Sequence, residues 1–334
     1  MKLIAETAWH HEGDYEFMKN LVTKISTKTE ADIVKLHITL NFDEYMHSSH
    51  DAYSLLKPWL FNRSQWNELI EIVRCNGKQI MLLLNDTEAI KFGLSFSPEY
   101  IEIHSTCLND VFMLEELRKG LSSTTKVVLG IGGASIDEID HAINYIKSSN
   151  MLLMFGFQNY PTVHEDVNLN KIRKIMRLFD NLEYGYADHT AWDSSHNELI
   201  TLLVAANGMS YIEKHVTTHF GEKRVDWPAA ISIEMFNKLS KKIKILNEVK
   251  GNGELSMNQG ELNYSIYGPM KKTAILKKDT TKGDVLTLDM IRFIRTNEIS
   301  DMSQVELIKS VGKKINKNLK CGTILMNKYL IDKE

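Results

Sequence analysis

Cysteine is scarce in this chain, and long apolar runs are missing. The three cysteines, Cys75, Cys107 and Cys321, lie far apart, so they form neither a metal-binding spacing nor a disulfide framework. No apolar run approaches the roughly 20 residues that a membrane-spanning helix needs. The formal net charge is only −3, which gives no electrostatic case for binding nucleic acid. We therefore expect a cytoplasmic protein that binds neither nucleic acid nor a membrane.

A glycine-rich phosphate loop is also missing after the first apolar segment, which argues against a doubly wound open sheet. Eight short apolar segments alternate with longer amphipathic ones over roughly 250 residues, as is typical of an α/β fold of the (β/α)8 TIM-barrel type. The expected strands span residues 3–7, 32–38, 79–85, 99–105, 126–132, 151–157, 182–188 and 211–217.

Two of the intervening segments carry clear helix signals. Phe17, Leu21 and Ile25 recur at the spacing of one helix face. Ser135 followed by Glu138 has the spacing of a capping box, which predicts a helix that begins after Ser135.

The pattern changes after residue 251, where we place the end of the barrel domain, residues 1–251. Residues 252–270 carry glycine, asparagine and serine without a clear period, and they are predicted to form a linker. Residues 271–334 combine short strands with Lys-Gly and Cys-Gly turns, which indicates a small β-rich domain. A domain of this size has little core of its own, so we expect it to pack on something larger.

Polar residues end most of the expected strands, and a TIM barrel places its active site at these ends. His189 and His215 end the seventh and eighth strands, which are neighbours in such a barrel. Because neighbouring strands lie about 4.8 Å apart, the two imidazoles could share one divalent ion. The two histidines do not have a fixed spacing that is typical of metal sites. Both could equally be ordinary hydrogen-bonding residues at the barrel mouth.

Lys35 stands inside an apolar strand, which is unusual for a lysine unless it is paired or functional. Glu6 ends the neighbouring first strand and could pair with it. A structural ion pair inside the barrel and a catalytic role are therefore both open. Tyr160 follows the sixth strand, and we expect its hydroxyl to point into the barrel mouth.

Several segments, in the same order along nearly the whole chain, resemble motifs of the N-acetylneuraminate (sialic acid) synthase family. The matching barrel segments are GYADHT for GYSDHT, IEKHVT for IEKHFT, YPTVHEDVNL for YPTPxEDVNL, ETAWHHEG for ExGxNHxG and IVKLH for VKFQ. The later segment AILKKDTTKGDVLTLDMI resembles the antifreeze-like (SAF) domain that ends these synthases. The resemblance implies a TIM barrel followed by a small β-clip antifreeze-like domain at residues 271–334.

Members of this family condense phosphoenolpyruvate with an N-acyl amino-sugar aldose, which gives a nonulosonic acid and phosphate. The resemblance implies that His189 and His215 hold a divalent metal ion, manganese or magnesium, which would polarise the sugar aldehyde. It also implies catalytic roles for three residues. Glu6 and Asp226 would orient groups or transfer protons, and Lys35 would bind phosphoenolpyruvate.

The resemblance further implies contacts with the substrate. The implied substrate-binding residues are Ser105, Gln158, Tyr160, Asp188, Lys214 and Arg295. Arg295 lies in the tail domain, where the family's arginine contacts the acyl group of a sugar bound to the other subunit. We therefore expect a domain-swapped homodimer with an amino-sugar or related small-molecule substrate.

The chain departs from the family pattern where the family mainly binds the phosphate of phosphoenolpyruvate. A lysine is replaced by Glu102 and an acidic residue by Cys107, while Leu84, Gly130 and Ala187 replace residues that carry hydroxyl groups. At about 4 Å and an effective dielectric constant near 20, a carboxylate repels each unit of phosphate charge by roughly 4 kcal/mol. The sequence therefore predicts weak or absent phosphoenolpyruvate binding, unless Glu102 is neutralised by a neighbouring cation.

Lys35 or a histidine such as His104 could provide that neutralisation, and three functions remain open. The chain could be a divergent synthase for nonulosonic acid or surface glycan biosynthesis, which binds phosphoenolpyruvate through new groups such as His10, His37 or His104. It could be an aldolase-like enzyme that uses pyruvate or another small donor, or a non-catalytic paralogue that binds a sugar or a partner. We expect a carbon–carbon bond-forming transferase or lyase, because a dead enzyme should lose metal ligands as readily as phosphate ligands.

Overall fold

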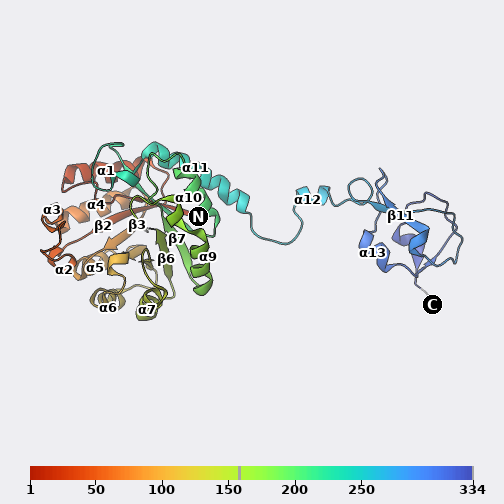
Figure 1. Ribbon diagram of the computed structural model, residues 1–334, viewed down its shortest axis with the longest axis horizontal. Coiled ribbons are helices and arrows are strands. Elements are labelled where there is room, and N and C mark those ends of the chain that lie inside the picture. Colours follow the sequence, from red (N-terminus) through yellow and green to blue (C-terminus); the bar gives the residue numbers. More distant parts are fainter. Residues whose placement is uncertain (157–158, 333–334) are drawn as a thin grey trace. The chain divides into compact units, whose positions relative to one another are not determined.

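The computed structural model describes residues 1–156 and 159–332 of the chain. The chain divides into two compact units, Met1–Gly251 and Asn252–Glu334 (Figure 1). Among the described residues, no helix is both long enough and apolar enough to cross a membrane.

The first unit is a closed barrel of parallel strands (Figure 1). Strands β1 to β8 pair in sequence order, and β1 also pairs with β8, so the sheet closes on itself. This closure confirms the (β/α)8 barrel and excludes the open sheet. The barrel strands are β1 (Lys2–Glu6), β2 (Ile33–Ile38), β3 (Gln79–Leu84), β4 (Tyr100–Ile103), β5 (Lys126–Gly130), β6 (Met151–Gly156), β7 (Glu183–Ala187) and β8 (Tyr211–Thr217).

Helices surround the strands (Figure 1). The long helices are α1 (Tyr15–Lys28), α4 (Arg63–Cys75), α5 (Thr87–Leu94), α6 (Val111–Gly120), α7 (Ile136–Ile146), α9 (Leu169–Leu178), α10 (Asn197–Ala206) and α11 (Ile233–Lys250). The short ones are α2 (Phe42–Tyr45), α3 (Tyr53–Leu56) and α8 (His164–Val167). A short strand, β9 (Ile231–Ser232), pairs with β8 just before α11.

Both helix signals in the sequence are confirmed. Phe17, Leu21 and Ile25 of α1 are all buried. At the start of α7, the Ser135 side chain accepts a hydrogen bond from the backbone N–H of Glu138, and the Glu138 carboxylate accepts one from the backbone N–H of Ser135.

Alternation along the strands separates two sets of side chains. One set packs between the sheet and the helices in a large apolar core. The other set fills the inside of the barrel. This interior cluster consists of Ile4, Ile33, Met81, Tyr100, Val128, Leu152, Met154, Ala187 and Tyr211.

Four charged residues lie one step further along the same interior face. Glu6, Lys35, Glu102 and Glu213 each come two residues after a member of the interior cluster, and side chains two residues apart on a strand point the same way. The alternation therefore places one lysine and three glutamates above an apolar layer, toward the C-terminal ends of the strands.

In its described part, residues 252–332, the second unit contains two small antiparallel sheets, a helix beside them and a short helix near its start. The sheets pair β10 (Thr273–Leu276) with β11 (Ile291–Ile294) and β12 (Lys314–Ile315) with β13 (Leu330–Ile331), and the helix beside them is α13 (Gln304–Lys309). Ten buried apolar side chains, among them Leu276, Leu286 and Leu325, form a core within this unit. We did not expect such a core from the sequence. Several of its residues lie in loops, which lack the regular spacing of apolar residues seen in strands and helices.

The predicted linker is partly ordered by local hydrogen bonds. Asn258 and Glu261 form a capping box at the start of a short helix, α12 (Gln259–Asn263). Near the end of the segment, the carbonyls of Tyr267 and Gly268 accept hydrogen bonds from backbone N–H groups of the second unit, at 2.9 and 3.0 Å. The last residues of the segment 252–270 are therefore hydrogen-bonded to the β-rich part of the second unit.

Candidate active site

A cavity of about 230 Å³ lies at the C-terminal ends of the barrel strands, and every barrel strand contributes to its lining. Twelve of the residues singled out in the sequence line this cavity. They are Glu6, Lys35, His37, Glu102, His104, Ser105, Gly130, Tyr160, Ala187, His189, His215 and Asp226. Residues from distant parts of the chain therefore meet where a TIM barrel carries its active site.

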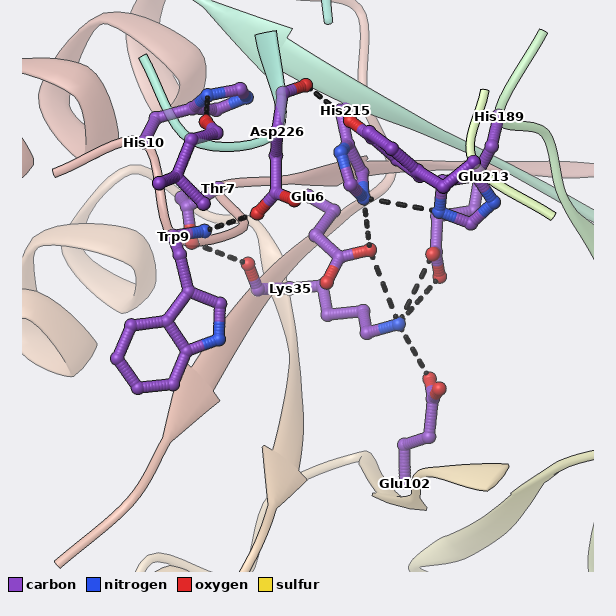
Figure 2. A network of polar contacts seen from close by, with 12 residues as sticks. Glu6, Thr7, Trp9, His10, Lys35, Glu102, His189, Glu213, His215 and Asp226 are labelled. Carbon is purple, nitrogen blue, oxygen red and sulfur yellow. Dashed lines mark hydrogen bonds and ion pairs between the residues drawn. The ribbon is translucent and has the colours of Figure 1, made fainter. Parts of the chain in front are cut away.

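The ammonium group of Lys35 lies among three carboxylates (Figure 2). Its Nζ atom is 2.8 Å from Glu102 Oε2, 3.3 Å from Glu6 Oε2, and 3.0 and 3.1 Å from the two carboxylate oxygens of Glu213. None of these four side chains is more than 6% exposed. Both sequence-based expectations for a partner of Lys35, Glu6 and Glu102, are met at once.

The charge of Lys35 does not lower the pKa values of the three buried carboxyl groups to the same extent. Burial raises the pKa of Glu102 and of Glu213, and the attraction of Lys35 only partly opposes this effect. Burial acts in the same direction on Glu6, but Lys35 and His215 together hold its pKa well below the usual range. Burial disfavours the charge on Lys35, but the three carboxylates raise its pKa, so its amine stays protonated.

The two histidines of the predicted metal site face each other across the cavity. Their Nε2 atoms lie 3.2 Å apart, and Nε2 of His215 lies 3.3 Å from Glu6 Oε2 (Figure 2). Burial lowers the pKa of His189 to about 3, so this imidazole is neutral, which is the form that binds metal ions.

The histidine pair fits a divalent ion as two of its ligands. An ion about 2.1 Å from each nitrogen can bridge this gap, because twice that bond length exceeds the separation of the two nitrogens. Across residues 1–156 and 159–332, however, no three His, Cys, Asp or Glu side chains are grouped so that they could hold a metal ion. Any further ligands would therefore have to be water or substrate atoms.

Asp226 and Tyr160 close one side of the cavity. Asp226 Oδ2 accepts a hydrogen bond from the backbone N–H of Trp9 at 3.0 Å, and the Tyr160 hydroxyl donates to the backbone carbonyl of Asp226. Burial raises the pKa of the Asp226 carboxyl group, with His215 opposing this shift. The loop that follows β8 thus holds an acid with a raised pKa beside the histidine pair.

Asp188 and Lys214 were expected to contact substrate, but neither lines the cavity. Their side chains are completely buried and form an ion pair at 2.8 Å, which is joined to Asn197 and Thr201 of α10. The reason is alternation along the chain: each residue immediately precedes a cavity-facing histidine, so its own side chain points outward. In this structure the pair belongs to the barrel wall.

Two residues of the expected donor pocket also lie elsewhere. Leu84 and Cys107 belong to the core between sheet and helices, and the cavity is lined by Leu83, one residue earlier on β3. The resemblance to the family motif identified β3 correctly, but it did not show which side chains of this strand point into the barrel. Of the expected donor pocket, Glu102, Gly130 and Ala187 do line the cavity.

Gly130 leaves no room for the hydroxyl-bearing side chain that the resemblance led us to expect. A Cβ atom at this position would lie 2.9 Å from the backbone nitrogen of Ser105, which is closer than real Cβ contacts. The backbone at Ser105 therefore occupies the space that such a side chain would need, and this wall of the cavity offers no hydroxyl from position 130.

Two more expected site residues are not among the described residues that line this cavity. Gln158 is not among the described residues. Arg295 is exposed in the second unit, where its Nε donates a hydrogen bond to the carbonyl of Pro269 at 2.9 Å. Its expected contact with a sugar in another subunit stays a prediction.

Sequence reasoning missed Glu213 as a site residue. The signal was present, because Glu213 stands two residues before His215 on the same strand and therefore points into the barrel as well. Trp9 and Tyr45, which were not singled out in the sequence either, also line the cavity. The ring of Trp9 meets that of His37 edge-on, with 5.2 Å between centroids.

Comparisons with known proteins agree with this geometry. The model of the NeuB family matches residues 21–255. The N,N'-diacetyllegionaminic acid synthase of Legionella pneumophila is 25% identical over 348 residues, which cover 98% of this chain and 94% of that protein.

Two crystal structures show the same fold. One is a Chromobacterium violaceum protein assigned to spore coat polysaccharide biosynthesis (protein E), with a TM-score of 0.82 and 18% identity over 99% of this chain and all of that one. The other is an N-acetylneuraminic acid (sialic acid) synthetase of Leptospira borgpetersenii, with a TM-score of 0.70 and 23% identity over 78% of this chain and 88% of that one. Since the family model covers more than half of the sequence, this chain belongs to the NeuB family.

Proposed function

We propose that this protein is a nonulosonic acid synthase-like enzyme that makes or alters a carbon–carbon bond on an amino-sugar-type substrate. Membership of the NeuB family and the similarity to a legionaminic acid synthase support this class of reaction. The cavity supports it as well, because His189, His215, Glu6, Asp226 and Tyr160 all converge there.

His189 and His215 are the residues that would hold a divalent ion, manganese or magnesium, and a bound ion would supply a Lewis acid for the sugar aldehyde. The protein's own groups supply acid and base. Glu6, with its lowered pKa, is ionised and can accept a proton or a hydrogen bond. Asp226, with its raised pKa, is suited to donate a proton to the oxygen of the former aldehyde.

The donor side of the cavity is altered, and one observation carries this part of the proposal: Glu102 lies 2.8 Å from Lys35. Among the described lining residues, Lys35 is the sole lysine or arginine, and its ammonium faces three carboxylates. The described lining residues therefore leave no lysine or arginine without a carboxylate partner for a phosphate group. The enzyme therefore does not hold phosphoenolpyruvate in the manner that the family resemblance implies.

An aldolase-like reaction with pyruvate or another small donor is the second candidate, and the Lys35–Glu102 contact favours it. In such a reaction the methyl group of pyruvate gives up a proton to a base, the resulting enolate carbon bonds to the aldehyde carbon, the aldehyde oxygen takes up a proton, and no phosphate is released. Lys35 does not form a Schiff base in this proposal, because that step needs a neutral amine and the carboxylates keep Lys35 protonated.

A non-catalytic role as a binding paralogue is the third candidate. It is disfavoured because the histidine pair, Glu6, Asp226 and Tyr160 remain together in one cavity. A protein that only binds a partner has no need for this arrangement.

The test is a product assay with metal-loaded protein. Phosphoenolpyruvate and pyruvate are each supplied with a panel of N-acyl amino sugars, and both phosphate release and nonulosonic acid formation are measured. We expect metal-dependent product with at least one donor. If neither donor yields product with any sugar, in either direction of the reaction, the proposed enzyme function is wrong.

A further inference from the structure

We propose that the end of the cavity beside Glu102 binds a cationic group of the substrate, such as a primary ammonium. This inference rests on the proposed function, because it takes the cavity to be the active site. It goes beyond that function by naming the charge of the group that occupies the altered end.

The first support is the balance of formal charge. Lys35 supplies one ammonium group, and three carboxyl groups, those of Glu6, Glu102 and Glu213, lie 2.8 to 3.3 Å from it. Glu213 already faces Lys35 with both of its oxygens. Lys35 therefore has two carboxyl partners besides Glu102, and Glu102 has no cation to itself.

The second support is a buried acceptor that the chain satisfies only in part. Oε2 of Glu102 lies 2.8 Å from Nζ of Lys35 in an ion pair, and within the described part of the chain this buried oxygen has no hydrogen-bond partner. The Glu102 side chain is only 3% exposed and lines the cavity. A buried carboxylate oxygen without a hydrogen-bond partner is costly, so a donor from a ligand would stabilise it.

The third support is the remaining lining of the same cavity. His37 and His104 line the cavity, and burial lowers their pKa to about 3 and about 4, so neither adds positive charge. The aromatic rings of Trp9 and Tyr45 line it too. Aromatic faces attract ammonium groups and do not attract phosphate.

The test compares three small acids that share a three-carbon skeleton but differ in the charge of the end group. They are β-alanine with an ammonium, butanoate with a methyl group, and 3-phosphonopropanoate with a phosphonate. Each is titrated calorimetrically into the full-length protein with manganese present. We expect the wild-type protein to bind β-alanine at least tenfold more tightly than either of the other two acids.

Two variants and one control sharpen the result. Glu102→Gln should reduce the preference for β-alanine over butanoate at least tenfold, and Glu102→Lys should reverse the order in favour of 3-phosphonopropanoate. Glu71→Gln, an exposed change on α4, should leave the order unchanged. Circular dichroism confirms that each variant is folded.

The inference is overturned if the wild-type protein binds all three acids equally, binds the phosphonate most tightly, or shows no binding of β-alanine. The wild-type comparison decides this even if a variant fails to fold. The outcome is separable from that of the proposed function. A preference for β-alanine without any carbon–carbon bond product would refute the enzyme function alone, and product formation from phosphoenolpyruvate with a preference for phosphonate would refute this inference alone.

Discussion

Nζ of Lys35 and Oε2 of Glu102 lie 2.8 Å apart at the centre of the barrel mouth. The contact joins β2 to β4, and both side chains are almost completely buried. Moving a charged group from water into the protein interior costs free energy, even when the group is paired with an opposite charge. We therefore expect a glutamate at this position to be unfavourable for stability, which is consistent with the proposed role in binding.

The pH dependence of the free energy of unfolding should show the cost of burying the Glu102 charge, when the wild-type protein is compared with a neutral replacement. Because burial raises the pKa of Glu102 in the folded state, its ionisation destabilises the fold above that pKa and has no effect below the pKa of the unfolded chain. We expect Glu102→Gln to be at least as stable as the wild-type protein at pH 8, with any advantage vanishing near pH 4. Urea unfolding at both pH values measures this. A variant that is clearly less stable at pH 8 would show that the glutamate stabilises the fold.

The histidine pair should bind one divalent ion per chain. His189→Ala and His215→Ala should each abolish bound manganese in elemental analysis, because each removes one of only two protein nitrogens at the site. Thermal unfolding should show that both variants remain folded. His196→Ala, an exposed change at the start of α10, is the matched control and should retain the ion. Metal retained by both cavity variants would place the ion elsewhere.

The Asp188–Lys214 pair should contribute to stability through the barrel wall. Lys214→Met leaves the Asp188 carboxylate buried without its cation, which costs about 3–5 kcal/mol in the free energy of unfolding. Lys242→Met breaks an exposed pair with Glu198 and should cost at most about 1 kcal/mol. Urea denaturation gives both values. Equal costs for the two substitutions would mean that the buried pair has no special structural role.

Arg295 should act on the sugar and not on the fold. We expect Arg295→Ala to raise the KM for an N-acyl amino sugar roughly tenfold, as for the loss of one charged hydrogen bond, with little change in stability. Arg292→Ala, an exposed change on β11, which ends just before Arg295, is the control. Sedimentation at micromolar concentration tests the expected dimer. A fully active monomer would contradict the contribution of a second subunit.

The barrel could be predicted from the sequence because its strands are buried on both faces. Such strands read as continuous apolar runs, and the predicted strand ends differ from the observed ones by two residues at most. The capping box at Ser135 was equally readable, since it depends only on two residues of known spacing. The core of the second unit was not readable, because its members lie partly in loops.

The candidate site was predicted less completely, because matching motifs gives positions along a strand but not the direction of side chains. Asp188 and Lys214 were placed in the cavity although they point outward, and Glu213 was overlooked although it points inward. A strict count of alternate residues from His189 and His215 separates these cases. The three carboxylates around Lys35 could not be counted from one strand, since they come from three different strands.

The central claim is that the donor end of this active site no longer accepts phosphate. The most direct measurement is a calorimetric titration of phosphoenolpyruvate into manganese-loaded protein, with Glu102→Lys and the surface control Glu71→Lys in parallel. We predict no binding in the micromolar range for the wild-type protein and for Glu71→Lys, and measurable binding for Glu102→Lys, because that change replaces a buried carboxylate by a cation. Micromolar binding of phosphoenolpyruvate by the wild-type protein would contradict the claim.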